Sequence, residues 1–231
     1  MSENKNFIPR CVGFIMDGNR RWAKALGKST LEGHLAGKEK LFDVVEWVVE
    51  AKIPHAVFYA FSTENWKRNK DEVEALLGLF SETIKSLQAE NEKRKVTVRI
   101  IGRRQDFSPD LQQAINELEE MGKNNPFDTT TIWIALSYGG RAEIIEAVNK
   151  AVQLGEEVNE ENFSNLLWTA GMVDPDIIVR TGGEKRLSNF LPWQTVYSEF
   201  FFIETFWPAF TKSEFTSILN EYAARERRIG K

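Results

Sequence analysis

Short apolar runs along this chain alternate with longer segments whose apolar residues recur at helical spacing. Six runs rich in β-branched and aromatic residues predict strands at residues 12–16, 56–61, 96–101, 131–136, 177–179 and 200–203. Helical periodicity predicts helices at residues 33–51, 71–92, 109–122, 141–154 and 212–228. Strands separated by helices of this length predict right-handed crossovers. The expected fold class is therefore α/β, with a central, mostly parallel six-stranded sheet flanked by helices on both faces.

Composition and charge narrow the class of protein. The chain has 231 residues, 42% of them hydrophobic, with no internal repeat or low-complexity linker, so residues 1–231 are expected to form a single domain. The net charge of -4 and the scattered basic residues argue against a nucleic-acid partner, so any anion site must be local. The single cysteine, Cys11, excludes an internal disulfide framework and fits a reducing cytoplasm. Because the first ten residues lack the apolar core of a signal peptide and no run approaches the roughly 18 apolar residues of a membrane span, we expect a soluble, cytoplasmic protein.

The segment after the first predicted strand, Asp17-Gly18-Asn19-Arg20-Arg21-Trp22, has a composition suited to phosphate chemistry. In open parallel sheets, ligands bind beyond the carboxyl ends of the strands. Here a carboxylate and a flexible turn precede the start of a helix, whose first N–H groups are unpaired. Two arginines beside them can fork onto phosphate oxygens. The segment predicts a site for a diphosphate and its metal ion, and the simpler alternative is a strand-to-helix turn with solvated charges.

Polar, glycine-rich or cationic segments also follow three other predicted strands. They are Ser62-Thr63-Glu64-Asn65-Trp66-Lys67-Arg68, Ser137-Tyr138-Gly139-Gly140-Arg141, and Arg180-Thr181-Gly182-Gly183-Glu184 with Arg186 and Ser188 close behind. Because the carboxyl ends of parallel strands meet at one edge of the sheet, we expect five arginines to reach one pocket. These are Arg21, Arg68, Arg141, Arg180 and Arg186. Together they indicate binding of more than one phosphate group.

Several other kinds of site are excluded or weakened by their spacing. The fragment Gly27-Lys28-Ser29-Thr30 resembles the end of a P-loop, but Trp22 occupies the position of the required first glycine. No G-x-G-x-x-G motif supports a dinucleotide cofactor. His34 and His55 lack the spacing of a zinc site. We interpret His55 as structural, and we expect His34, which lies near the start of a predicted helix, to bind an anion.

The motifs together resemble one family, the cis-prenyltransferases or Z-isoprenyl diphosphate synthases, which includes undecaprenyl diphosphate synthase. The matching segments run in order from the Asp17 motif through Gly33-His34, the loop from Phe61 to Trp66, the segment from Arg180 to Phe190, and Glu199 to Arg228-Ile229-Gly230. They cover almost the whole chain, and several motifs in one order are more specific than any single motif.

The resemblance implies Mg2+-dependent condensation of isopentenyl diphosphate with an allylic prenyl diphosphate. It assigns Mg2+ to Asp17 and Glu199, and the allylic diphosphate to the backbone of residues 18–21 and the side chains of Arg21, His34 and Arg68. Isopentenyl diphosphate is assigned to Arg180, Arg186 and Ser188. Asn65 is implied in the proton loss, and we interpret it as orienting the substrate, because a neutral amide is a very poor base. Further substrate contacts are implied for Gly18, Asn19, Arg20, Trp22, Ser62, Thr63, Glu64, Trp66 and Leu187. Glu64 and Trp66 have the alternative role of structural props for their loop.

This chain departs from the family pattern at three positions. Arg20 replaces a common glycine, and only the backbone of that position is expected to matter. Thr30 stands where the family has an arginine, which leaves open whether Lys28 supplies the missing phosphate contact. Ser137 replaces an asparagine before Tyr-Gly-Gly-Arg, so a direct role for its side chain is not expected.

The product is expected to be a long polyprenyl diphosphate close to undecaprenyl, made from farnesyl or geranylgeranyl diphosphate. The resemblance places an apolar tunnel beside the helix with Leu76, Leu77, Leu79, Phe80, Ile84 and Leu87, although such a stripe by itself indicates ordinary core. It also implies a homodimer in which the Arg228-Ile229-Gly230 element reaches the partner's site, and peripheral membrane contact through the lipid product. The alternatives are a short- or medium-chain synthase and a non-catalytic partner subunit, which would lack the metal carboxylate and phosphate arginines present here.

Overall fold

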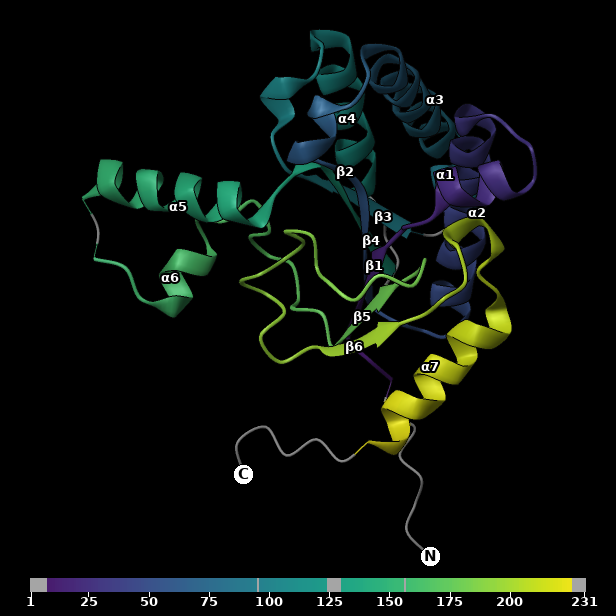
Figure 1. Ribbon diagram of the computed structural model, residues 1–231. Helices are drawn as coiled ribbons and strands as arrows, with labels where there is room; N and C mark the ends of the chain where they lie inside the picture. Colours follow the sequence, from purple (N-terminus) through teal and green to yellow (C-terminus); the bar gives the residue numbers. More distant parts are fainter. Residues whose placement is uncertain (1–7, 95, 124–129, 156, 226–231) are drawn as a thin grey trace, which may run out of the picture.

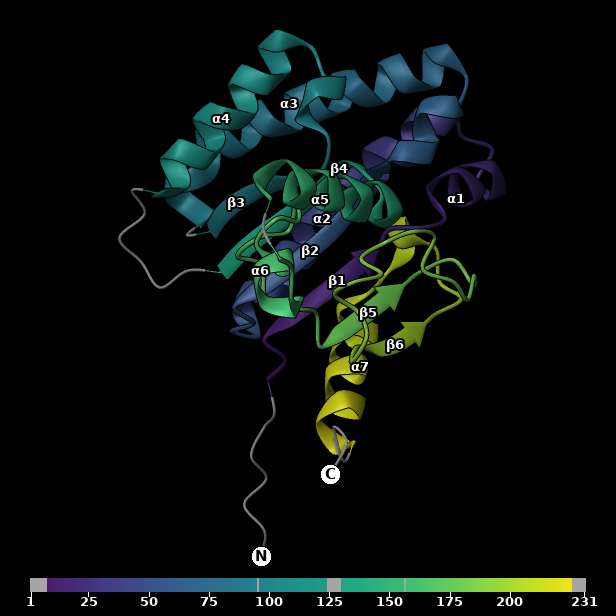
Figure 2. The same cartoon turned by 90° about the vertical axis from the view of Figure 1, so that its left-hand side faces the viewer.

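The computed structural model describes residues 8–94, 96–123, 130–155 and 157–225. Its six strands form one sheet in the order β3-β4-β2-β1-β5-β6, and all neighbouring strands among the described residues are parallel. The strands are β1 (Cys11–Ile15), β2 (His55–Ser62), β3 (Val96–Ile101), β4 (Thr130–Tyr138), β5 (Ile177–Arg180) and β6 (Glu199–Phe202). All six predicted strands are confirmed, and all carboxyl ends lie at the same edge of the sheet (Figures 1 and 2).

Four helices cover one face of the sheet. They are α2 (Thr30–Glu50), α3 (Lys70–Arg94), α4 (Pro109–Lys123) and α7 (Lys212–Ala224). Their apolar residues form a single cluster with the sheet, in which the rings of Phe14 and Phe58 stack 5.0 Å apart. This side provides most of the hydrophobic core.

The opposite face packs largely against the irregular segment between residues 165 and 198, which contributes the buried Phe190 and Leu191. The helices α5 (Gly140–Leu154) and α6 (Glu160–Ser164) instead project from one side of the sheet (Figure 1). Helices were expected on both faces of the sheet. They pack directly on one face, whereas the 165–198 segment covers most of the other. Within the described ranges, no helix combines the length and the apolar composition needed to cross a lipid bilayer.

Local capping explains where the helix boundaries differ from the prediction. α2 begins at Thr30 rather than at residue 33, because Ser29 caps it and forms a reciprocal capping box with Glu32. α7 ends at Ala224 rather than near residue 228, because Arg225 has an extended backbone. The 228–230 motif lies outside the described residues. Shorter elements complete the chain: α1 (Asn19–Ala25) and the 3-10 helices η1 (Thr63–Lys67), η2 (Arg104–Asp106) and η3 (Trp207–Ala209).

Candidate active site

Asp17 follows the carboxyl end of β1 and is held between two arginines. Its Oδ1 atom lies 3.1 Å from Nη2 of Arg21 on α1, and its Oδ2 atom lies 2.8 Å from Nη2 of Arg180 at the end of β5. The turn depends on Gly18, whose φ of 108 is in the left-handed region and where a Cβ would lie 2.7 Å from the ring of Phe206. The carboxylate is thus presented at the junction of β1, β5 and α1, and its remaining lone pairs can serve a cation.

Arg180 organises the neighbouring loop. Its guanidinium is almost fully buried, and Nη1 donates to Oγ of Ser188 at 2.8 Å and to the backbone carbonyl of Arg186. Glu184 pairs with Arg186 and lies 3.7 Å from Nη1 of Arg21. The structure therefore brings Arg180, Arg186 and Ser188 together beside Asp17, as the sequence predicts.

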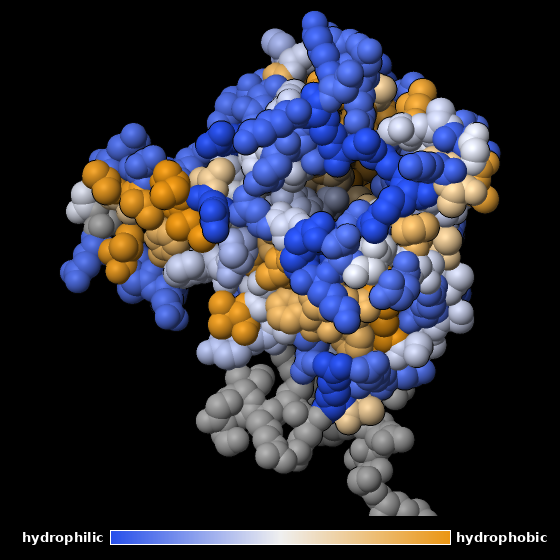
Figure 3. Space-filling model, viewed as in Figure 1, coloured by the Kyte–Doolittle hydropathy of each residue, from blue (hydrophilic) through white to orange (hydrophobic). Residues whose placement is uncertain are grey.

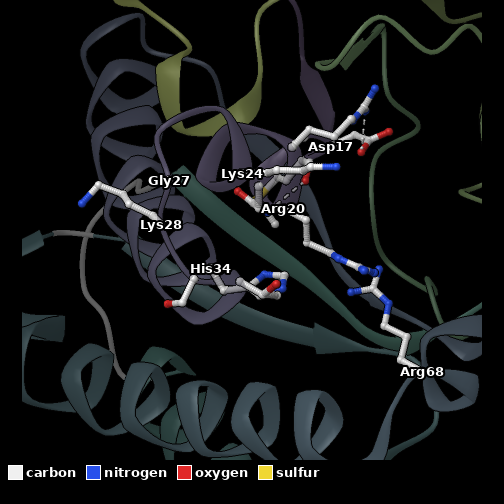
Figure 4. A pocket seen from close by; sticks show the side chains of 13 residues that line it. Asp17, Arg20, Lys24, Gly27, Lys28, His34 and Arg68 are labelled. Atoms are coloured by element: carbon white, nitrogen blue, oxygen red, sulfur yellow. Dashed lines mark hydrogen bonds and ion pairs between the residues drawn. The ribbon is translucent and has the colours of Figure 1, made fainter.

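A broad polar pocket of about 820 Å3 lies on the α1 and α2 side of Asp17 (Figure 4). It is lined by Met16, Asp17, Gly18, Asn19, Arg20, Arg21, Lys24, Gly27, Lys28, Ser29, Thr30, His34 and Arg68. No side chain caps the start of α1, so the N–H groups of its first turn are not occupied by a side-chain acceptor. Five Lys and Arg side chains line this pocket against one carboxylate, which favours a multiply charged anion.

Lys28 and Thr30, which lie at or near the position of the missing family arginine, both line this pocket. Lys28 lies 3.6 Å from Glu32 and points away from Arg20 and Arg68, whereas the guanidinium groups of Arg20 and Arg68 point toward one another (Figure 4). Thr30 lines the pocket but carries no charge. The expectation that only the backbone matters at position 20 is therefore too narrow, because the Arg20 side chain lines the pocket.

A second pocket of about 620 Å3 adjoins the first and shares Met16, Asp17, Asn19, His34 and Arg68 with it. Its other lining residues are Ile15, Tyr59, Ala60, Ser62, Glu64, Asn65, Leu76, Arg180, Arg186, Ser188 and Asn189. Two anions bound in these pockets would both lie close to Asp17. The arrangement suits a reaction between two phosphorylated substrates.

A small apolar cavity of about 80 Å3 extends from this second pocket between β2, α2 and α3. Ala60 and Leu76 line both spaces, and Leu79, Phe80 and Trp207 line the cavity further in. The register of β2 against β4 shifts between Tyr59 and Phe61, which is a β-bulge at Ala60. Of the predicted tunnel stripe, Leu76, Leu79 and Phe80 line the cavity, whereas Leu77, Ile84 and Leu87 are packed in the core.

His34 lies in the second turn of α2, not at its N-terminus, because that helix begins at Thr30. Its Nε2 atom is buried and has no hydrogen-bond partner, and it lies 3.5 Å from Oε1 of Glu72. Burial lowers the pKa of His34, the Arg68 charge lowers it further, and Glu72 opposes both effects. The imidazole lines both polar pockets, with its Nε2 atom turned toward Glu72.

The loop after β2 is held by its own polar side chains. Oδ1 of Asn65 accepts the N–H of Ser62 at 3.0 Å, and the indole N–H of Trp66 donates to Oγ of Ser137 at 2.8 Å. Oε1 of Glu64 accepts from Nδ2 of Asn189 at 2.9 Å. Burial raises the pKa of Glu64, but hydrogen bonds from Asn189 and the loop outweigh it and leave the pKa lowered. Asn65 and Glu64 line the second pocket, whereas Trp66 supports the loop from behind.

Five predicted residues lie outside both polar pockets. Trp22, Thr63, Trp66 and Leu187 are not among the lining residues, and neither is Arg141, whose backbone N–H instead donates to Asn189. The five arginines predicted to reach one pocket are therefore divided: Arg21 lines the first pocket, Arg180 and Arg186 line the second, Arg68 lines both, and Arg141 lines neither.

The structure also does not bring Glu199 to Asp17 within one chain. Glu199 begins β6 opposite Ile177, which is itself paired with Val12. Glu199 is therefore level with Val12, at the amino-terminal end of the strands. Ile15 is already about 10 Å further along β1, so Asp17 lies at the opposite, carboxyl-terminal end of the strands. The Glu199 carboxylate is instead paired with Arg225.

Two contributors to this site were missed by the sequence reasoning. The hydroxyl of Tyr59, which lines the second pocket, donates to the carbonyls of Tyr138 and Ser188 at 3.2 Å each. Burial raises the pKa of Tyr59 well above its ordinary value, so it stays protonated. Glu72, in the first turn of α3, contacts Arg20, His34 and Arg68, which all line the first pocket. Strand alternation could have marked Tyr59, and i,i+4 spacing could have paired Glu72 with Arg68, but no sequence signal joins Glu72 to Arg20 or His34.

Comparisons with known proteins agree with this geometry. A family model described as putative undecaprenyl diphosphate synthase matches residues 15–230. An isoprenyl transferase from Aquifex pyrophilus is 44% identical over 225 residues, covering 97% of this chain and 96% of that protein. A tritrans,polycis-undecaprenyl-diphosphate synthase (geranylgeranyl-diphosphate specific) from Thermococcus kodakarensis is 42% identical over 233 residues, covering 97% and 88%.

Two solved structures share the fold over nearly the full chain. Lavandulyl diphosphate synthase from Lavandula x intermedia, solved with dimethylallyl diphosphate, has a TM-score of 0.90 at 30% identity and covers 96% of this chain and 98% of its own. A probable undecaprenyl diphosphate synthase from Campylobacter jejuni has a TM-score of 0.82 at 35% identity and covers 100% of both chains.

Proposed function

Because this chain belongs to the cis-prenyltransferase family, whose members are prenyltransferase enzymes, we propose that it condenses isopentenyl diphosphate units onto an allylic prenyl diphosphate. The observation that carries the proposal is the meeting of two cation-lined pockets at Asp17, with an apolar cavity leading away from Ala60 and Leu76. Two diphosphates and one growing hydrocarbon chain each have a matching surface.

The two diphosphates use different sets of cations. The allylic diphosphate occupies the pocket lined by Arg20, Arg21, His34 and Arg68, with the N–H groups at the start of α1 as further donors. Isopentenyl diphosphate lies against Arg180, Arg186 and Ser188. Holding both substrates beside Asp17 orients the homoallylic double bond toward the allylic carbon, which supplies much of the rate enhancement.

The donor set also fits Mg2+. In the part of the chain that the structure describes, no group of three or more His, Cys, Asp or Glu side chains could hold a metal. Mg2+ does not require one, since it retains waters and takes one or two carboxylates together with substrate phosphates. Asp17 is the ligand that this chain offers beside the diphosphate pocket, and Mg2+ bound there supplies positive charge to the departing diphosphate. Glu199 lies too far away within the same chain to share that ion.

Bond formation requires the arginines to stabilise developing charge as the allylic C–O bond breaks. The new carbon skeleton then loses a proton. Asn65 orients the substrate for this step: Oδ1 is held by the N–H of Ser62, and the side chain lines the second pocket. A neutral amide is a very poor base and Tyr59 stays protonated, so we propose a diphosphate oxygen or water as the acceptor.

The proposed product is a long-chain polyprenyl diphosphate near undecaprenyl, a carrier-lipid precursor, and the proposed primer is farnesyl or geranylgeranyl diphosphate. The name of the Thermococcus kodakarensis relative supports both the product length and a geranylgeranyl primer. The apolar cavity between β2, α2 and α3 is the proposed start of the path for this chain. A short- or medium-chain product is the second candidate, favoured by this small cavity and by the likeness to lavandulyl diphosphate synthase.

The active form is proposed to be a cytoplasmic homodimer. The outer face of α5 carries Ile145, Val148 and Val152, and Ile145 and Val152 are 62% and 75% exposed. Figure 3 shows hydrophobic surface gathered on the part of the molecule that projects from the sheet. A second copy would cover this face. Peripheral membrane contact follows from the lipid product. A purely non-catalytic subunit is disfavoured, because Asp17 and the phosphate arginines are present and assembled.

The test is incubation of the purified protein with Mg2+, radiolabelled isopentenyl diphosphate and either farnesyl or geranylgeranyl diphosphate, followed by sizing of the products. Long polyprenyl products near eleven isoprene units are expected. Products stopping after one or two additions would support the second candidate. Absence of any label transfer with either primer would overturn the proposal.

A further inference from the structure

The carboxylate of Glu72 lies within 4 Å of three groups that line the pocket proposed for the allylic diphosphate: Arg20, His34 and Arg68. Its Oε1 accepts a hydrogen bond from Nη1 of Arg68 at 3.0 Å and lies 3.5 Å from Nε2 of His34. Its Oε2 lies 3.7 Å from Nη1 of Arg20. Three elements therefore converge on one side chain: α1 through Arg20, α2 through His34, and the segment entering α3 through Arg68.

The carboxylate lies behind these groups rather than among them. Arg20, His34 and Arg68 all line the 820 Å3 pocket, but Glu72 does not line it, and its side chain is only 15% exposed. Glu72 is therefore not placed to contact a diphosphate directly. It can hold the groups that do.

Electrostatics explains why such a residue is needed. The guanidinium groups of Arg20 and Arg68 point toward one another (Figure 4), and like charges repel at short range unless an anion lies between or beside them. Asp17, the carboxylate that does line this pocket, is already paired with Arg21 and Arg180. Without Glu72, the Arg20 and Arg68 side chains would separate into solvent before substrate binds.

Glu72 also ties the polar pocket to the apolar cavity. Leu76 lies one helical turn after Glu72 on α3 and lines both the second polar pocket and the cavity. The contacts to Arg20 and His34 thus anchor the first turn of α3 at the entrance through which the prenyl chain would pass.

We propose that Glu72 is a positioning residue that preorganises Arg20, His34 and Arg68 for the allylic diphosphate. The identity of the ligand in this inference rests on the proposed function. The geometry of the three contacts is independent of that function.

The experiment compares Glu72→Gln with Glu74→Gln, a control that removes a charge from the same turn of α3. Glu74 is well exposed and pairs only with the exposed Lys70 at 3.7 Å. Calorimetric titration with inorganic pyrophosphate is expected to give a Kd about tenfold higher for Glu72→Gln, a loss typical of supporting groups around a binding site. Glu74→Gln is expected to stay within about twofold of wild type, since exposed pairs contribute little.

A second readout follows the histidines by NMR, since the chain has only His34 and His55. The pKa of His34 is expected to fall further in Glu72→Gln, because the carboxylate raises it in the wild type and the Arg68 and Arg20 charges then act unopposed. The titration of His55, where burial alone lowers the pKa, should not change. Glu72→Asp, which keeps the charge, should bind pyrophosphate more tightly than Glu72→Gln.

Several results would overturn the inference: pyrophosphate binding by Glu72→Gln equal to wild type, an unchanged His34 titration, or equal weakening in Glu72→Asp and Glu72→Gln. Steady-state kinetics of Glu72→Gln give a further check. The KM for the allylic substrate should rise, whereas the KM for isopentenyl diphosphate should stay nearly unchanged. Wild-type protein that binds pyrophosphate but transfers no prenyl group would remove the proposed function and leave the role of Glu72 intact.

Discussion

Ala60→Leu tests where the growing chain lies. Ala60 lines both the second polar pocket and the apolar cavity of about 80 Å3. Leucine adds three carbons to the side chain at the mouth of this cavity. The substitution would therefore narrow the path past Leu76. We expect Ala60→Leu to accumulate shorter prenyl diphosphates than wild type.

Stability should change little in this variant. Burying three additional carbons contributes about 2 kcal/mol at roughly 0.8 kcal/mol each, which offsets much of the 1–3 kcal/mol that overpacking typically costs. For a chain of this size, a net change of about 1 kcal/mol moves the Tm by about 2–4 °C. A comparable or smaller Tm shift is expected for Ala60→Leu.

The matched control is Ala56→Leu. Ala56 lies on the same strand and packs in the same core cluster, but it is 0% exposed and lines neither the cavity nor the two polar pockets. It has no space to fill, so the full overpacking cost of about 1–3 kcal/mol should appear as a lower Tm. The product distribution of any folded Ala56→Leu protein should match wild type.

The assay is chromatographic sizing of radiolabelled products from wild type and both variants, with Tm measured on the same preparations. An unchanged product distribution in folded Ala60→Leu would remove Ala60 from the tunnel wall. Equal shortening by Ala56→Leu would show that any core perturbation shortens the product. A wild-type product of only three isoprene units would overturn the long-chain proposal itself.

Three further outcomes are expected. Asp17→Ala should lower kcat by at least about two orders of magnitude while circular dichroism stays native, since it removes an electrostatic catalytic group; near wild-type turnover with normal Mg2+ dependence would refute the metal assignment. Arg186→Ala should raise the KM for isopentenyl diphosphate well above any change for the allylic substrate in steady-state assays, and equal effects would contradict the division of the site. The pKa values of His34 and His55 are lowered in the folded state, so the unfolded chain binds more protons below about pH 6.5 and the free energy of unfolding should fall from pH 7 to about pH 5.5. Urea titrations should show a smaller fall when both histidines are replaced by Gln, and an equal fall would assign the effect to other groups.

Local sequence patterns determined much of the fold and the chemistry of the site. Apolar runs and helical periodicity located all six strands and the five long helices, because burial of one face imposes those periods on the sequence. The rule that parallel strands present their carboxyl ends together then placed Asp17 beside Arg180 and Arg186, far away along the chain. The capping box of Ser29 and Glu32 was also readable and would have corrected the start of α2.

Tertiary structure alone decided the features that depend on side-chain direction and strand register. The bulge in β2 aims both Ala60 and Phe61 at the same core, which strict alternation forbids. The register of β6 put Glu199 at the edge opposite Asp17. Glu72 pairs with Arg68 four residues earlier, but it reaches Arg20 and His34 only because α1, α2 and α3 converge at the pocket. Periodicity records which face of an element is buried, but it carries no information on which side chains from separate elements meet, since that is set by how the elements pack.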